Sequence, residues 1–225
     1  FAQSVGGGGG SGSYTLDILS ASKATFAFGL NIGGANGNGG SGDDVTVNNS
    51  GDIFTWGHDS SGLVAQSIGG GGGSVATSLV FDLVGTAIGT IGSRIGEKPK
   101  RSINIALGRS GGTGGASGLV SVYSEGSITT SGDRSTGILA QSIGGGGGNS
   151  GTRSIGVIGS NTPEPGNKTR VFETSLSVGI EGGSGSTGGV VNVRSESDIT
   201  TGGFASHAIH AQSIGGGGGA GGSAS

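Results

Sequence analysis

The sequence predicts an all-β fold, a repetitive β-solenoid with glycine-rich turns and hairpin-like loop excursions. Two observations predict it: a motif that returns four times, and short alternating apolar segments at a fixed distance before each later copy. The motif reads Ala-Gln-Ser, then one β-branched residue, then five glycines, and it begins at Ala2, Ala65, Ala140 and Ala211. Self-similarity of this kind is the signature of repeat architectures.

The repeats form one continuous array over residues 1–225, with boundaries at about 2–64, 65–139 and 140–210 and a partial repeat at 211–225. The glutamines of successive motifs are 63, 75 and 71 residues apart. The chain opens inside one motif and stops just after another, so we expect it to be a piece of a longer array.

The half of each repeat that precedes the motif has a constant length of 23 residues, at Val45–Ser67, Val120–Ser142 and Val191–Ser213. Each copy has three short alternating stretches, Val-x-Val, Ile-x-Thr and Leu/Ile-x-Ala, separated by turn-forming residues. Such alternation indicates strands with one buried face. Three strands in 23 residues are about the length of one triangular coil, which favours two to three coils per repeat. If each repeat were instead one large layer, equivalent glutamines would stack directly.

The other half varies in length and contains longer alternating runs at Thr25–Gly34, Ser102–Gly112 and Thr174–Gly183, each preceded by a further apolar run. These halves predict hairpin-like excursions or one to two further coils. Their connecting loops, Arg94–Arg101 and Asn161–Arg170, differ most between repeats. Because loops tolerate variation and carry contacts, they are the predicted places for a partner to bind.

Composition limits the function classes. Glycine makes up 58 of 225 residues without a Gly-x-y register, which excludes a collagen triple helix. Few aromatic residues predict a narrow aliphatic core, with glycines supplying positive φ at tight corners. The net charge of −3 and the scattered basic residues argue against nucleic-acid binding. Cysteine is absent, which fits an exported protein, and no apolar stretch is long enough to span a membrane.

The repeated pattern G-x-I-x-T-x-G…AQSIGGGGG resembles the passenger regions of large Gram-negative autotransporter proteins. Three segments ending in the motif carry this resemblance: GDIFTWGHDSSGLVAQSIGGGGG, GSITTSGDRSTGILAQSIGGGGG and SDITTGGFASHAIHAQSIGGGGG. The resemblance implies a right-handed parallel β-helix, display at the outer-membrane surface, and a role in adhesion or biofilm formation. It carries over no catalytic residue. The resemblance does not extend to the barrel or the signal peptide of a full autotransporter, and we expect such segments to lie outside these 225 residues.

The motif residues are predicted to be structural. Five glycines can follow an extended polyproline-II-like path whose donors and acceptors must find partners outside the segment. We therefore expect the runs to pack where a side chain would obstruct approach, so that Gly71→Val destabilises the fold. The predicted motif positions are Gln3, Gly6, Gln66, Gly69, Gly71, Gln141, Gly144, Gln212 and Gly215.

Three groups of residues could carry chemistry, but each also has a structural explanation. Asp43 and Asp44 stand in a near match to a calcium-binding nonapeptide, but the equivalent positions of later repeats carry no Asp. His207 and His210 would point to opposite faces of a strand, which disfavours a metal pair. His58 and Asp59 are adjacent and have no nucleophile elbow, so they do not predict a hydrolase.

The sequence thus predicts a non-enzymatic extracellular structural or adhesive protein that needs no cofactor and presents a surface-displayed stalk. Its expected partners are host or matrix molecules, with no nucleic acid and no membrane insertion. A self-assembling extracellular fibre subunit is the alternative, and a calcium-binding β-roll is a lesser one.

Overall fold

The computed structural model describes residues 1–13, 15–19, 26–32, 34, 36–84, 101–159 and 172–224. All regular structure in these ranges is β-strand, which confirms the all-β prediction. The strands coincide with the alternating stretches of the sequence, in the constant and in the variable halves alike.

The strands recur in the same order in each repeat. The motif strands are β1 (Ala2–Val5), β6 (Leu63–Ile68), β11 (Ile138–Ile143) and β16 (Ile209–Ile214). The variable halves contain β2 (Thr15–Leu19), β7 (Ser78–Val84) and β12 (Arg153–Gly159), followed by β3 (Phe26–Ile32), β8 (Arg101–Leu107) and β13 (Phe172–Val178). The constant halves contain β4 (Val45–Asn49), β9 (Val120–Ser124) and β14 (Val191–Ser195), followed by β5 (Ile53–Thr55), β10 (Ile128–Thr130) and β15 (Ile199–Thr201).

Every strand pairs in parallel with its counterpart in the neighbouring repeat, so each sheet holds one strand from each repeat. Gln3, Gln66, Gln141 and Gln212 are in register across the motif strands. Each repeat is therefore a single layer, and the expectation of two to three coils per repeat is wrong. The constant half resembles a closed triangular coil in length, but the variable half completes the same layer.

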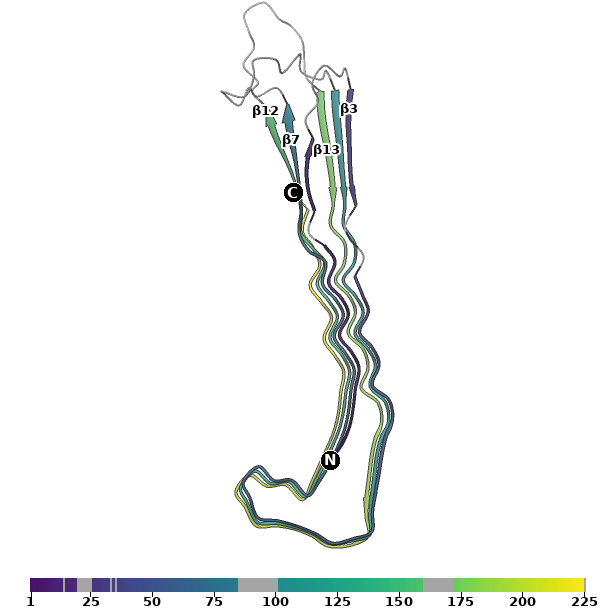
Figure 1. Cartoon of the computed structure of the whole chain (residues 1–225), viewed down its shortest axis with the longest axis vertical. Coiled ribbons are helices and arrows are strands. Elements are labelled where there is room, and N and C mark those ends of the chain that lie inside the picture. The colour runs from purple at the N-terminus through teal and green to yellow at the C-terminus, as the bar shows by residue number, and fades with distance from the viewer. Residues whose placement is uncertain are drawn as a thin grey trace, which may run out of the picture.

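The layers are long and narrow and lie on top of one another (Figure 1). In each layer the chain leaves the motif strand along one side, passes through β7 or its equivalent, and returns through β8. The two long strands of an excursion belong to different sheets, β2-β7-β12 and β3-β8-β13, both parallel. The excursions are therefore not antiparallel hairpins, because their strands take hydrogen bonds from the next layer.

The apolar core lies at the end of the layer where the chain turns through β4, β5 and β6 (Figure 1). Its members are Val45, Leu63, Ala65, Val120, Val122, Ile128, Ile138 and Ala140. Burial depends on position in the stack: Ile138 of the middle layer is 0% exposed, whereas its counterpart Ile209 in the last layer is 45% exposed. A layer thus gains most of its apolar burial from the layers on either side.

The corner between β5 and β6 holds non-glycine residues in the left-handed region. Asp59, Arg134 and Ala205 occupy equivalent positions with φ of 55°, 54° and 52°. Gly57, Gly132 and Gly203, which lie at this corner, have no positive φ, so the expectation that glycine supplies the positive φ of tight corners is wrong here.

Replacing Ala205 by glycine should stabilise the protein by about 1 kcal/mol, because a Cβ is disfavoured at this φ and glycine is not. Chemical denaturation of the variant measures this gain. Ala140→Gly is the control: Ala140 is a buried strand residue, so the same change there should lower stability. Equal losses in both variants would contradict the strain at Ala205.

Candidate functional site

The glycine runs join the outgoing and returning sides of the layers. Two residues of each run belong to chains of hydrogen bonds that cross between the sides: each amide in such a chain donates to a carbonyl on the opposite side, and the carbonyl of the donating residue accepts from the next layer, at 2.7–3.0 Å. One such chain of hydrogen bonds passes through Gly7, Gly40, Gly70, Gly115, Gly145, Ser186 and Gly216; a second passes through Gly10, Gly37, Gly73, Gly112, Gly148, Gly183 and Gly219. We call this arrangement the glycine lattice.

The lattice has a period of three along the chain. Gly69, Gly72 and Val75 donate along the stack to the next layer, at 2.8, 2.8 and 2.9 Å. Gly70 and Gly73 donate across to the returning side. Three residues per turn is the repeat of a polyproline-II-like helix, which makes no hydrogen bond within itself. Each run therefore satisfies its donors in two directions outside itself.

Close approach of neighbouring chain segments, both across the layer and between layers, requires glycine at two of the three positions. A Cβ on Gly69 would overlap the carbonyl of Gly115, and a Cβ on Gly70 would overlap that of Gly7. Gly6 and Gly144 are crowded in the same way by Gly40 and Ser186. At the third position a Cβ has room: that of Gly71 would lie 3.8 Å from Gly146 O. Gly215 is the counterpart of Gly69 and Gly144, but it lies in the last layer, where its Cβ would be 3.6 Å from Ser186 O. Gly71 is exposed, so it is the wrong position for a test of packing.

The motif serine continues the lattice with its side chain. The hydroxyl of Ser142 donates to Gly118 O at 2.8 Å, and Ser142 Oγ accepts a hydrogen bond from Gly189 N at 2.8 Å. Ser67 repeats this one layer earlier, between Asp43 O and Gly118 N. These serines were not among the predicted site residues. Their presence in all four copies of the motif was the available signal.

The motif glutamines form a ladder on the outer face of β1, β6, β11 and β16. Each side-chain amide donates to the carbonyl oxygen of the glutamine in the next layer. The distances are 3.3 Å for Gln3 to Gln66, 2.7 Å for Gln66 to Gln141 and 2.9 Å for Gln141 to Gln212. The ladder has one direction, so its two ends are chemically different.

Gln141→Ala should lower the free energy of unfolding by about 1 kcal/mol, because it removes two half-buried ladder bonds at once. Gln3→Ala is the matched control, since Gln3 makes one longer, exposed bond and should have a much smaller effect. Equilibrium urea unfolding compares the two. Equal effects of both substitutions would argue against the ladder as a source of stability.

The corner between β5 and β6 is closed by repeated hydroxyls. The hydroxyl of Thr130 donates to Ser135 O at 2.6 Å, and Ser135 Oγ donates to Gly57 O of the preceding layer at 2.9 Å. Outside the corner, Arg134 donates two hydrogen bonds to the Asp59 carboxylate at 2.7 and 2.8 Å. These bonds lower the pKa of Asp59 and raise that of Arg134.

Tyr123, Arg194 and two glutamates form a cluster on the outer face of β9 and β14. Tyr123 OH donates to Glu125 at 3.0 Å, and this bond, followed by burial and by Glu196, raises the pKa of Tyr123 to about 12. The Arg194 guanidinium lies 5.7 Å from the centre of the Tyr123 ring.

Titration of the tyrosine absorbance should show Tyr123 ionising near pH 12, and Glu125→Gln should move it toward the usual value of about 10. Because the folded pKa is raised, the stabilising effect of the neutral phenol is complete below pH 10 and is lost as the pH approaches 12. Tyr123→Phe identifies the signal, since Tyr14 is the other tyrosine. A profile that Glu125→Gln leaves unchanged would contradict the assignment.

The structure gives the other predicted residues backbone or surface roles. The backbone amide of Asp43 donates to Ser4 Oγ, and its carbonyl oxygen accepts from the hydroxyl of Ser67. Asp44 Oδ1 accepts from Leu119 N of the next layer at 2.7 Å. The described residues hold no group of three or more His, Cys, Asp or Glu arranged for a metal ion.

The histidine prediction was wrong in its geometry. His207 precedes β16 and does not lie within it, and its ring meets that of His210 edge to face with centroids 5.5 Å apart. His58 accepts a hydrogen bond from Asp133 N at 3.3 Å, while its neighbour Asp59 binds Arg134. His58 and Asp59 thus bind different residues of the next layer.

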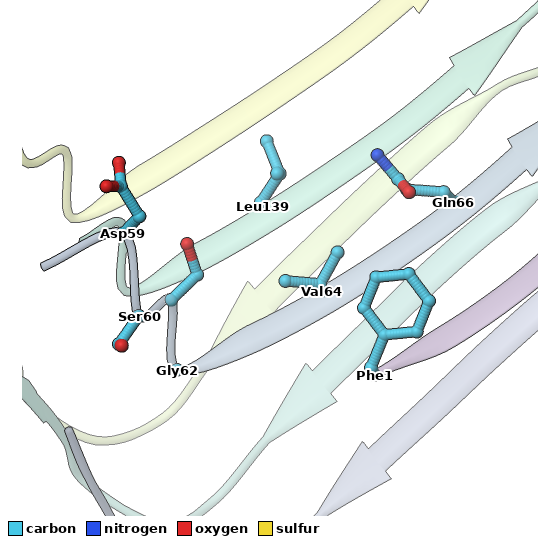
Figure 2. Close-up of a pocket in the computed structure, with 8 residues that line it drawn as sticks. Phe1, Asp59, Ser60, Gly62, Val64, Gln66 and Leu139 are labelled. Atoms are coloured by element: carbon cyan, nitrogen blue, oxygen red, sulfur yellow. The ribbon is translucent and has the colours of Figure 1, made fainter. Parts of the chain in front are cut away.

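A surface hollow of about 550 Å³ lies beside the same corner (Figure 2). Val64, Gln66 and Leu139 form its floor on the outer face of β6 and β11, and Phe1 and Asp59 flank it. Its remaining lining residues are Ser60, Ser61 and Gly62. The Asp59 carboxylate is already bound by Arg134. The hollow therefore combines apolar side chains with hydroxyl and amide groups.

The predicted partner-binding loops, Arg94–Arg101 and Asn161–Arg170, lie outside the described residues, apart from Arg101 at the start of β8. Within the described ranges there is no helix long and apolar enough to cross a bilayer.

The structure brings together repeated backbone and side-chain bonds between layers. Chemically, this arrangement holds sheets at fixed spacing and presents columns of identical side chains. Comparison with protein-family models, with curated proteins and with solved structures gives no match.

Proposed function

We propose that this chain is a non-enzymatic extracellular structural protein, a right-handed β-solenoid that forms a stalk or adhesive surface displayed on a Gram-negative bacterium. The observation that supports the structural role is the glycine lattice, which repeats in every layer and fixes its two sides together. In repeat proteins each unit contacts its neighbours only, so stability grows as units are added. The motif that resembles autotransporter passengers supports the location and the adhesive role.

A variant with a second copy of residues 69–143 inserted after Ile143 tests the structural role. The inserted segment equals one period between β6 and β11, so the added layer should continue every sheet in register. We expect a folded protein whose stack is thicker by about 4.8 Å in solution scattering and which unfolds at higher denaturant concentration. Insertion of residues 69–142, which shifts the register by one residue, is the control and should destabilise the fold. Equal behaviour of both insertions would overturn the proposal.

The adhesive role has its own test. Beads coated with the chain should bind matrix proteins or glycans saturably, and beads coated with chemically unfolded chain should not. Binding that is absent across such a panel would leave a structural protein without the adhesive role. Folding that is lost in a calcium chelator would instead favour the β-roll, with Asp43 and Asp44 as the first residues to replace.

A self-assembling fibre subunit is the second candidate, favoured by the apolar side chains on the outermost strands. Phe28, Leu30 and Ile32 of β3 are about half exposed, as are Leu176 of β13 and Ile209 of β16. Electron microscopy across a concentration series distinguishes the two functions. Discrete particles at every concentration support the displayed stalk, and long uniform filaments support the fibre.

A further inference from the structure

Arg153, the first residue of β12, has a buried side chain without a partner. The residue is 1% exposed, and its Nε, Nη1 and Nη2 atoms make no hydrogen bond with any group that the structure describes. The structure describes two arginines in ion pairs, and both are exposed: Arg134 binds Asp59 and Arg194 binds Glu196. Arg153 is thus a buried cation of a different kind.

The backbone around Arg153 places its side chain between the outgoing and returning sides of the layers. Arg153 N donates to Ser223 O at 2.9 Å, and Ser177 Oγ of β13 donates to Arg153 O at 3.4 Å. Ser177 is in register with Ala106 of β8, which is 0% exposed, and Asn104 stands two residues earlier on the same face of β8 at 1% exposed. The interior here is closed to solvent and contains polar as well as small side chains.

An arginine side chain stays charged in a protein at any physiological pH. Burial lowers the pKa of Arg153, and none of the carboxylates whose side chains the structure describes offsets that effect. A buried ion without a counter-charge is strongly destabilising, because the water it gives up is not replaced. Five N–H donors in a planar fork therefore require an acceptor of negative charge at this place.

We propose that Arg153 is the centre of a binding site for a small inorganic anion such as chloride, enclosed between the two sides of the third layer. The size of the ligand follows from the burial of the guanidinium, since an anion attached to a larger molecule would hold the interior open to solvent. The bound anion neutralises the charge and accepts the guanidinium hydrogen bonds. This inference is independent of the proposed function, because a stalk and a fibre subunit would both contain the site.

The test is thermal unfolding of the whole 225-residue chain in sodium chloride and in sodium gluconate at equal ionic strength. A ligand that binds only the folded state raises the Tm, and saturation at about 100 times Kd should raise it by about 5 °C. Chloride-35 NMR provides a second measurement: exchange with the buried site should broaden the chloride line. Two results together would overturn the proposal: a Tm that is the same in chloride and in gluconate, and a chloride line width that the folded protein leaves unchanged.

Arg153→Met keeps a long side chain and removes the charge. We expect it to lose both the chloride-dependent Tm shift and the line broadening, and to match or exceed the Tm of the natural chain in gluconate. Arg134→Met removes an exposed arginine and should keep both chloride effects. If Arg153→Met retains them, or if it is much less stable than the natural chain in gluconate, the guanidinium has a protein partner and the anion site is refuted.

Discussion

Gly145→Ala should destabilise the protein by about 3 kcal/mol, a large fraction of the stability of an ordinary domain. Gly145 lies in the third of the four glycine runs and donates to Gly115 O at 2.9 Å, while Ser186 N donates to its carbonyl at 3.0 Å. A Cβ there would overlap the carbonyl of Gly70. The obstructing atom belongs to the equivalent run of the preceding layer, so relief requires the two layers to move apart at this point, which would distort both hydrogen bonds.

Gly146→Ala is the matched control, one residue further along the same run. Its Cβ would lie 3.6 Å from Gly217 O, an ordinary contact. Since alanine also reduces the freedom of the unfolded chain, this variant should be unchanged or slightly more stable. Guanidinium unfolding of both variants measures the difference. If Gly146→Ala costs as much as Gly145→Ala, the glycines are needed for backbone conformation and not for close approach.

Ser142→Ala should cost about 2 kcal/mol, because it removes a buried hydroxyl that links three groups. Gly118 O loses its donor, Gly189 N loses its shorter acceptor, and the bond of 2.7 Å to Ser117 Oγ disappears. Gly189 N keeps a contact of 3.2 Å with Ser117 Oγ, which limits the loss.

Ser131→Ala is the control for Ser142, since Ser131 is exposed on the outer side of the β10 corner. We expect its unfolding midpoint to match that of the natural chain. Hydrogen exchange adds a local measurement: Ser142→Ala should speed the exchange of the Gly189 amide more than that of amides in the apolar core. Uniform acceleration throughout the chain would show that the serine acts through global stability alone.

The strands could be predicted from the sequence because each one alternates. Val120 and Val122 of β9 are buried while Ser121 and Tyr123 are more exposed, and Ile128 and Thr130 of β10 are buried on either side of the more exposed Thr129. That pattern of period two is visible in the sequence. The parallel arrangement was expected only from the resemblance to autotransporter passengers, and the structure has it in every sheet that it describes.

The number of coils in each repeat could not be predicted from the sequence, because the glycine runs that connect the strands show no pattern. In a run of five glycines every residue is the same, so the period of three that separates Gly70 from Gly71 is invisible. The pairing of the run with the returning side, around Gly40 and Gly115, depends on the path of the chain between them. Arg153 was missed for a similar reason: its counterparts are Thr15 and Ser78, so repetition gave no signal.

The one-layer repeat has a consequence for reach. Layers in a parallel stack are about 4.8 Å apart, so each period of 71 or 75 residues adds only that much along the stacking direction. An extension of about 100 Å would need about 20 repeats, or about 1,500 residues. The layer is therefore much longer than the distance that each repeat adds along the stack. Most of the surface that such a protein exposes is the side of the stack, where equivalent residues of successive layers form parallel rows.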